Sequence, residues 1–172
     1  DTKSTIQFAS KIRIQKEPHG DYVRFISLPQ NGGEVQFPAC FSWSIQITSC
    51  PAGWTWPRVS KALKTLNPPH IDIDYIDGKG LAQLAPVLQS LQGIILYSDT
   101  ICDDDLKALL SCKALTSLTL YSCNKLTDAG MVHIGTLTTL KTLYPPKQIT
   151  SSGLEHLNTL NKLTSLELGR KF

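Results

Sequence analysis

The sequence predicts an α/β fold in which short parallel strands alternate with helices in a repeated unit. Four segments share one pattern of apolar, small and acidic residues, and their starts lie 25, 25 and 23 residues apart. A leucine-rich strand pattern comes before each of them, and apolar residues at helical spacing come after. Such a period is typical of stacked repeats, in which one unit cannot bury both of its faces alone.

The four shared segments read IDGKGL, ICDDDL, LTDAGM and ITSSGL, at residues 76–81, 101–106, 126–131 and 149–154. Each places a polar residue where a helix is expected to begin. Oxygen acceptors at helix starts satisfy the free N–H groups of the first turn. We therefore expect Asp103, Asp128 and Ser151 to cap the helices that follow them.

The clearest strand pattern is Leu115-x-x-Leu118-x-Leu120-x-x-Cys123-x-x-Leu126. Its period of two predicts a short strand with one buried face, and Cys123 fits a small buried position after the strand. Similar patterns begin at residues 91, 140 and 163, and a poorer one begins at residue 66. The helical runs are expected to bury Leu81, Leu84, Val87, Leu88, Leu106, Leu109, Leu110, Met131, Ile134, Leu137, Leu154, Leu157 and Leu160.

One longer stretch, Cys112-x-x-Leu115-x-x-Leu118-x-Leu120-x-x-Cys123-x-x-Leu126-Thr127-Asp128-x-x-Met131, resembles the cysteine-containing subclass of leucine-rich repeats. The resemblance covers about residues 58–172. Repeats of this kind occur in many F-box substrate adaptors, in bacterial proteins and in a mitochondrial ATP-synthase coupling factor. The resemblance implies a solenoid of about four repeats, with parallel strands on a concave face, helices on a convex face, and partners bound through the concave face.

Residues 1–57 lack the repeat and read as a β-rich cap or small domain in front of a repeat stack at residues 58–172. Their β-branched and aromatic runs predict strands at residues 5–14, 22–28, 34–37 and 41–48, with turns at 17–21 and 30–33, and a lead-in helix at 59–66. The preferred interpretation is a cap over the first repeat. The alternative is a separate interaction surface that uses Trp43, Trp54 and Trp56.

The strand pattern also predicts which side chains face away from the helices. The candidate binding residues on this concave face are Ile95, Tyr97, Thr119, Tyr121, Tyr144 and Glu167. The same reasoning places Gly93, Ser98, Ser117, Ser122, Thr142, Pro146, Lys147, Ser165, Gly169, Arg170, His70 and Asp72 there. We expect Tyr97, Tyr121 and Tyr144 to lie close together, either as a partner site or as ordinary cross-strand packing.

No cofactor, metal site or catalytic residue is expected. The acidic run at residues 103–105 reads as helix capping rather than cation binding, because carboxylates are favoured at helix starts. His133 and His156 match in the repeat, but two ligands are too few for a usual metal site. Cys112 and Cys123 are expected to be buried and unreactive, whereas a bond between Cys40 and Cys50 stays open. No phosphate loop, nucleophile elbow or carboxylate pair is visible, so the chain is not expected to be an enzyme.

Composition excludes two classes of partner. The chain has 172 residues, a net charge of +3 and no long basic run, so a nucleic-acid binder is not expected. No apolar stretch is long enough to span a membrane. The compartment stays open, since a start at Asp1 is compatible with a removed targeting segment, while buried free thiols slightly favour an intracellular location.

The sequence therefore predicts a protein–protein interaction module whose partner it does not identify. Two alternatives are an assembly subunit that uses its ends and amino-terminal segment, and an enzyme with an unrecognised site. The final pattern, LTSLELGRKF, gives a strand without a following helix. Its edge would be uncovered, so we expect that a partner covers it, that a second copy of the chain pairs with it, or that the chain is a fragment of a longer one.

Overall fold

The computed structural model describes residues 11–16, 23–26, 41–47 and 55–168. In this part the chain forms one sheet of eight strands in the order β2-β1-β3-β4-β5-β6-β7-β8. β1 pairs antiparallel with β2 and β3, and every pairing from β3 to β8 is parallel. The strands are β1 (Lys11–Lys16), β2 (Val23–Ile26), β3 (Phe41–Ile47), β4 (His70–Asp74), β5 (Gly93–Tyr97), β6 (Ser117–Tyr121), β7 (Thr142–Tyr144) and β8 (Ser165–Leu166).

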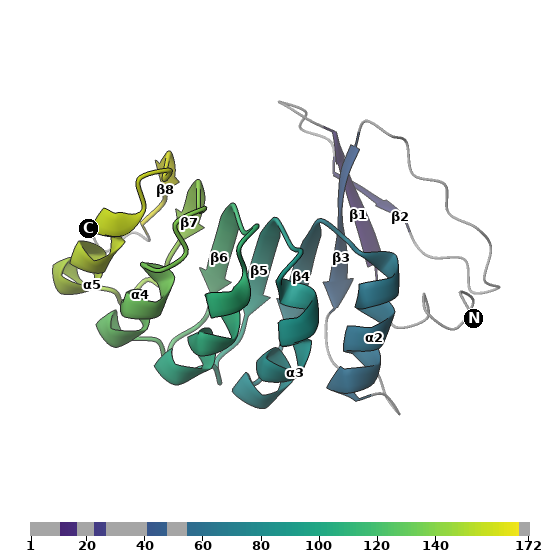
Figure 1. The fold of residues 1–172 in the computed structure, drawn as a ribbon, viewed down its shortest axis with the longest axis horizontal. Helices are drawn as coiled ribbons and strands as arrows, with labels where there is room; N and C mark the ends of the chain where they lie inside the picture. The colour runs from purple at the N-terminus through teal and green to yellow at the C-terminus, as the bar shows by residue number, and fades with distance from the viewer. Residues whose placement is uncertain (1–10, 17–22, 27–40, 48–54, 169–172) are drawn as a thin grey trace.

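The helices lie along one face of the parallel strands, as Figure 1 shows. Each connects one strand to the next, and helices from successive units pack against each other. The α-helices are α2 (Trp56–Leu66), α3 (Gly78–Leu88), α4 (Asp128–Ile134) and α5 (Ser151–Glu155), and the 3-10 helices are η1 (Asp103–Ser111) and η2 (His156–Thr159). The predicted α/β architecture with a parallel sheet is therefore present.

The amino-terminal strands belong to the same sheet as the repeated units. β3 pairs in parallel with β4, with Ser44 opposite His70, and β1 covers the other edge of β3. The strands predicted at residues 5–14, 22–28 and 41–48 overlap β1, β2 and β3. The predicted lead-in helix is α2, which begins three residues earlier than expected. The predicted strand at residues 34–37 and both predicted turns lie outside the described residues. The domain boundary after residue 57 stays a prediction.

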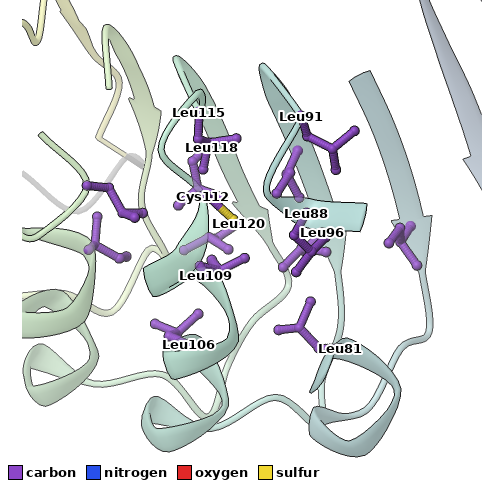
Figure 2. Packing of buried hydrophobic residues seen from close by; sticks show 14 of the residues in the cluster. Leu81, Leu88, Leu91, Leu96, Leu106, Leu109, Cys112, Leu115, Leu118 and Leu120 are labelled. Atoms are coloured by element: carbon purple, nitrogen blue, oxygen red, sulfur yellow. The ribbon is translucent and has the colours of Figure 1, made fainter. Parts of the chain in front are cut away.

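Apolar side chains fill the layer between the parallel strands and the helices. Strand β6 directs Leu118 and Leu120 into this layer, where each is at most 2% exposed. Figure 2 shows the helix residues Leu106 and Leu109 beside them, with Cys112 nearby. The same positions recur in neighbouring units, so one continuous cluster runs from Ile45 to Leu160. The predicted core positions are thus confirmed in most of their detail.

Leu110 is an exception, because it is 37% exposed although it was predicted to be buried. The helix that carries it, η1, is a 3-10 helix with three residues per turn. Leu106, Leu109 and Cys112 then share one face at a spacing of three residues, and Leu110 is rotated away from the core. Leu154 is also only partly buried.

The helix caps differ from the prediction. The N-cap residues are Asp77, Cys102, Thr127 and Thr150, and the last three lie one position before the predicted caps. The side chain of Asp77 accepts from the Gly80 N–H, and that of Thr127 accepts from the Ala129 N–H. The prediction that Asp103, Asp128 and Ser151 cap the helices was therefore wrong.

Asp103 and Asp128 join successive units instead. The Thr127 backbone N–H donates to Asp103 Oδ1 over 2.8 Å, and the Thr127 hydroxyl donates to the other carboxylate oxygen over 2.6 Å. Asp128 accepts the same two bonds from Thr150. These hydrogen bonds hold the pKa of Asp128 below its usual range. Their contribution to stability is therefore present above the pKa of the unfolded chain, and it is lost as pH falls through the lower folded value.

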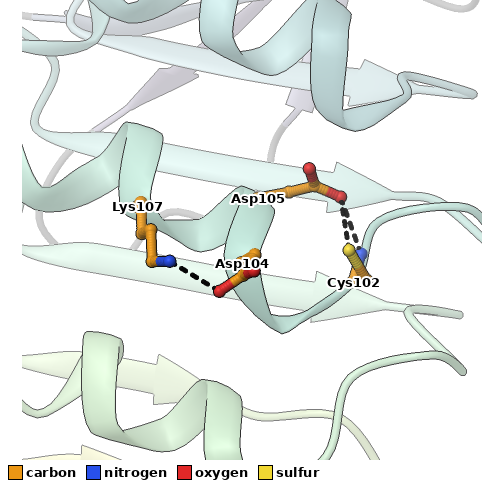
Figure 3. A network of polar contacts seen from close by, with 4 residues as sticks. All are labelled: Cys102, Asp104, Asp105 and Lys107. Atoms are coloured by element: carbon orange, nitrogen blue, oxygen red, sulfur yellow. Dashed lines mark hydrogen bonds and ion pairs between the residues drawn. The ribbon is translucent and has the colours of Figure 1, made fainter.

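At the junction before these two, the carboxylate comes from the following unit and not from the preceding one. Asp105 belongs to the same unit as Cys102 and accepts from its backbone N–H over 2.9 Å and from its thiol over 3.1 Å (Figure 3). The Asp105 carboxylate occupies the space that a side chain at Gly78 of the preceding unit would need. In the next two junctions the carboxylate comes from the preceding unit, and glycine stands at the position equivalent to Asp105, as Gly130 and Gly153.

We expect Leu118→Ala to lower the free energy of unfolding by about 2–5 kcal/mol, because it leaves a cavity in the continuous core. The matched control is Leu110→Ala, where the side chain is 37% exposed and the expected loss is about 1 kcal/mol or less. Urea denaturation of both variants measures the difference. Equal losses would contradict the description of the core.

Gly130→Ala is expected to destabilise the protein by about 1–3 kcal/mol, because the new methyl group overlaps the Asp103 carboxylate. In an Asp103→Ala background the same change should stabilise by about 0.5–1 kcal/mol, since alanine is the better helix former. Urea denaturation of the four proteins of this cycle tests the reversal of sign. The same effect in both backgrounds would show that the overlap does not matter.

Candidate functional site

The candidate site lies on the face of the parallel strands opposite the helices, which we call the open face. Parallel pairing places its side chains in rows that cross the strands. The central row joins Gln46, Asp72, Ile95, Thr119 and Tyr144, one from each strand from β3 to β7. The next row, at the carboxyl end of the strands, joins Asp74, Tyr97 and Tyr121. The predicted binding residues thus share one face, but they occupy two rows.

Tyr97 and Tyr121 form an exposed aromatic pair on this face. Their ring centroids are 4.9 Å apart, and the rings are inclined by 26° in a stacked arrangement. Each side chain is 39% exposed. Direct pairing of the two residues across β5 and β6 creates the stack, which is the arrangement that the sequence predicted for these two tyrosines.

Tyr144 lies on the same face but in the other row. It pairs with Thr119 rather than with Tyr121, because the in-register pairs of β6 and β7 are Ser117 with Thr142 and Thr119 with Tyr144. Its hydroxyl donates a hydrogen bond to the Glu167 carboxylate, which raises the pKa of Tyr144, as do partial burial and the negative charge of Glu167. Tyr144 therefore lies on the same face as Tyr121, as expected, but in the neighbouring row, where it pairs with Glu167.

Thr119 is only 6% exposed, although it was expected to face solvent. In its row it lies between Ile95 and Tyr144, both of which have longer side chains. Ile95 and Tyr144 are themselves partly buried, and Glu167 is exposed. Of the six predicted residues, Tyr97, Tyr121 and Glu167 are therefore the most accessible.

Four other residues that were expected on this surface are buried for different reasons. The hydroxyl of Ser98 donates to the Ile76 carbonyl over 2.6 Å and thereby joins two units. Gly93 has no side chain, and the His70 ring occupies the adjacent space. Asp72 and Pro146 are also buried, whereas Ser122 and Lys147 are exposed. Gly169 and Arg170 lie outside the described residues.

A hollow of about 320 Å³ opens at the carboxyl ends of the strands beside the tyrosine stack. Its lining includes Asp74 and Tyr75 at the end of β4, and Tyr97 and Asp99 at the end of β5. Gln46, Ser98 and Ser122 complete the lining. Sequence reasoning missed Asp74, Tyr75 and Asp99. The sequence signal for them was their position at the end of each run of alternating residues that predicts a strand. The carboxyl ends of parallel strands meet at one edge of the sheet, so residues at these positions come together.

Tyr75 is held in an unusual conformation at the rim of this hollow. Its φ of 56° lies in the left-handed region, which a bulky residue rarely adopts. Its backbone N–H donates to the Tyr97 carbonyl over 2.8 Å, and its side chain is 79% exposed. The structure therefore fixes the backbone at Tyr75 while its ring stays accessible to solvent.

The helical side carries the remaining candidates from the sequence. Asp104 forms an ion pair with Lys107 at 2.7 Å (Figure 3), and this contact lowers the pKa of Asp104. His133 is partly buried and His156 is exposed. Among the described residues, no group of three or more His, Cys, Asp or Glu side chains is placed to hold a metal ion.

The two cysteines of the repeat pattern are placed as predicted. Cys112 and Cys123 are buried, and burial raises the pKa of each thiol to about 11. Such a thiol is almost entirely protonated at neutral pH and is a poor nucleophile. Cys102 is exposed. Cys40 and Cys50, together with Trp54 and the side chain of Trp43, lie outside the described residues, whereas Trp56 packs against the core.

The chain matches no known protein-family model and no curated protein sequence. None of the described helices is long and apolar enough to cross a membrane.

We expect Glu167→Gln to lower the pKa of Tyr144 toward the ordinary value near 10.0, because it removes the negative charge of the carboxylate that accepts a hydrogen bond from the hydroxyl. Resonances of the individual tyrosine rings, followed by NMR as pH rises, measure this shift. Glu155→Gln is the matched control, since it removes the same charge from α5 on the helical side. An unchanged Tyr144 titration in Glu167→Gln would contradict the hydrogen bond.

Proposed function

We propose that this chain is a leucine-rich-repeat solenoid that binds another protein through its open, concave face, and that it is not an enzyme. The repeat period, the alternation of strands and helices, and the continuous apolar layer support the solenoid. The observation that carries the binding proposal is the stacked pair Tyr97 and Tyr121. Both rings stay 39% exposed on a face that the described helices leave uncovered.

The physical case rests on what such a surface gains when it is covered. Tyrosine combines a large apolar ring with a polar hydroxyl and has few rotatable bonds, so a partner gains contact area at low entropic cost. The stack restricts both rings before binding. Tyr144 and Glu167 add a paired polar contact in the neighbouring row. Together these residues offer an aromatic centre with polar surroundings, which is the usual composition of a protein interface.

A second proposal, an assembly subunit that uses its ends, is favoured by one observation at β8. Both strand residues are exposed, and Leu166 is 40% exposed. An exposed strand edge can pair with another chain. Analytical ultracentrifugation separates the two proposals, because an assembly contact at β8 should be lost in Leu166→Lys and retained in the open-face variants.

Replacement of Tyr97, Tyr121 and Tyr144 by Ala is expected to abolish capture of the partner in affinity purification followed by mass spectrometry. Loss of one central tyrosine from an interface commonly costs about 2 kcal/mol or more, so three losses should weaken binding more than a hundredfold. The matched control is Leu110→Ala with Val132→Ala, which removes exposed side chains from the helical side. Capture should be unchanged in this control.

Thermal unfolding of both variants checks that each is folded at the temperature of the experiment. Retention of every partner by the folded triple-alanine variant would overturn the proposed use of the open face. Loss of the partner only in the helical-side control would assign binding to the helices instead.

A further inference from the structure

We propose that the hollow beside the tyrosine stack binds an arginine side chain presented by the partner protein. This inference rests on the proposed function, and it names the chemistry that the partner must carry. Tyr75 and Tyr97 supply aromatic surface, and Asp99 supplies an exposed carboxylate, all within one hollow of about 320 Å³.

The charge of the lining favours a cation. Two of the seven described lining residues are aspartates and none is basic, although the whole chain carries a net charge of +3. A phosphate or an acidic peptide would face repulsion from the exposed Asp99 carboxylate, and like charges at an interface disfavour a partner strongly. The negative charge of the described lining therefore favours a basic group, although the whole chain is positively charged.

The size of the hollow favours one side chain over a larger ligand. Sites for small molecules and cofactors span about 300–1,000 Å³, so this hollow lies at the lower end of the range. A single long basic side chain fits such a volume while the rest of a peptide lies along the open face. The position at the carboxyl ends of the strands lets Tyr121 and Tyr144 contact the same peptide.

The aromatic residues favour arginine over lysine. A guanidinium group is planar, stacks on tyrosine rings and pairs with a carboxylate through two parallel hydrogen bonds. The Tyr97 ring is held by its stack on Tyr121, and the Tyr75 backbone is held by its bond to the Tyr97 carbonyl. Because these groups are ordered before binding, little entropy is lost when the side chain enters.

The probe for this site is the peptide Gly-Ser-Arg-Ser-Gly with blocked ends, titrated into the full chain and followed by NMR. We expect saturable shifts at the Tyr75 and Tyr97 rings and at the Asp99 backbone amide. The same peptide with citrulline, which keeps the shape of arginine but has no charge, should bind about tenfold more weakly or worse. A lysine peptide should fall between them.

Two variants locate the interaction. Asp99→Asn should weaken binding of the arginine peptide by about tenfold, because it removes a charged acceptor. Tyr75→Asn should weaken it by about threefold through loss of the ring, and asparagine tolerates the φ of 56° at this position. Asp104→Asn is the matched control, since it removes the same charge on the helical side and should leave the affinity unchanged.

Equal binding of the arginine and citrulline peptides, no saturable shift, or no effect of Asp99→Asn would each overturn the inference. The proposed function stands by itself if the triple-tyrosine variant loses its partner while Asp99→Asn keeps it. If the arginine peptide binds as described but the triple-tyrosine variant keeps every partner, the open-face proposal fails and the arginine site remains.

Discussion

The structure depends on in-register parallel pairing of strands that each bury one face under a helix. Residues opposite each other along β4, β5 and β6 are equivalent in the repeat, so Ile73, Leu96 and Leu120 line up in one buried row. A shift of register by one residue would move each of these side chains to the open face. The same pairing that forms the core therefore decides which side chains the protein presents on its other face.

The junctions between units show how a single hydrogen-bonding need can be met from two directions. The backbone N–H of Cys102, Thr127 or Thr150 finds a carboxylate at each junction. Asp105 supplies it from within the same unit, whereas Asp103 and Asp128 supply it from the unit before. Because two side chains cannot occupy one space, glycine stands wherever the opposite residue provides the carboxylate. The contribution of each junction to stability therefore depends on two residues: the one that provides the carboxylate and the glycine that leaves space for it.

The open face has two parts with different consequences. Its central row is less accessible, since Thr119 is buried between Ile95 and Tyr144, and Tyr144 pairs with Glu167. Its carboxyl end stays accessible, because the tyrosine stack and the loops after β4 and β5 surround a hollow that the described side chains leave unfilled. The proposed binding of a partner, and of its arginine, both depend on this end of the face.

The sequence by itself determined the unit, its α/β character, most of the buried leucines and the pairing of Tyr97 with Tyr121, because these follow from periods of two and about three to four residues along the chain. Only the tertiary structure decided the rest. The role of Asp103, the burial of Thr119 and the hollow around Tyr75 depend on neighbours one repeat away. Folding brings these neighbours together, so a pattern within one unit could not show them.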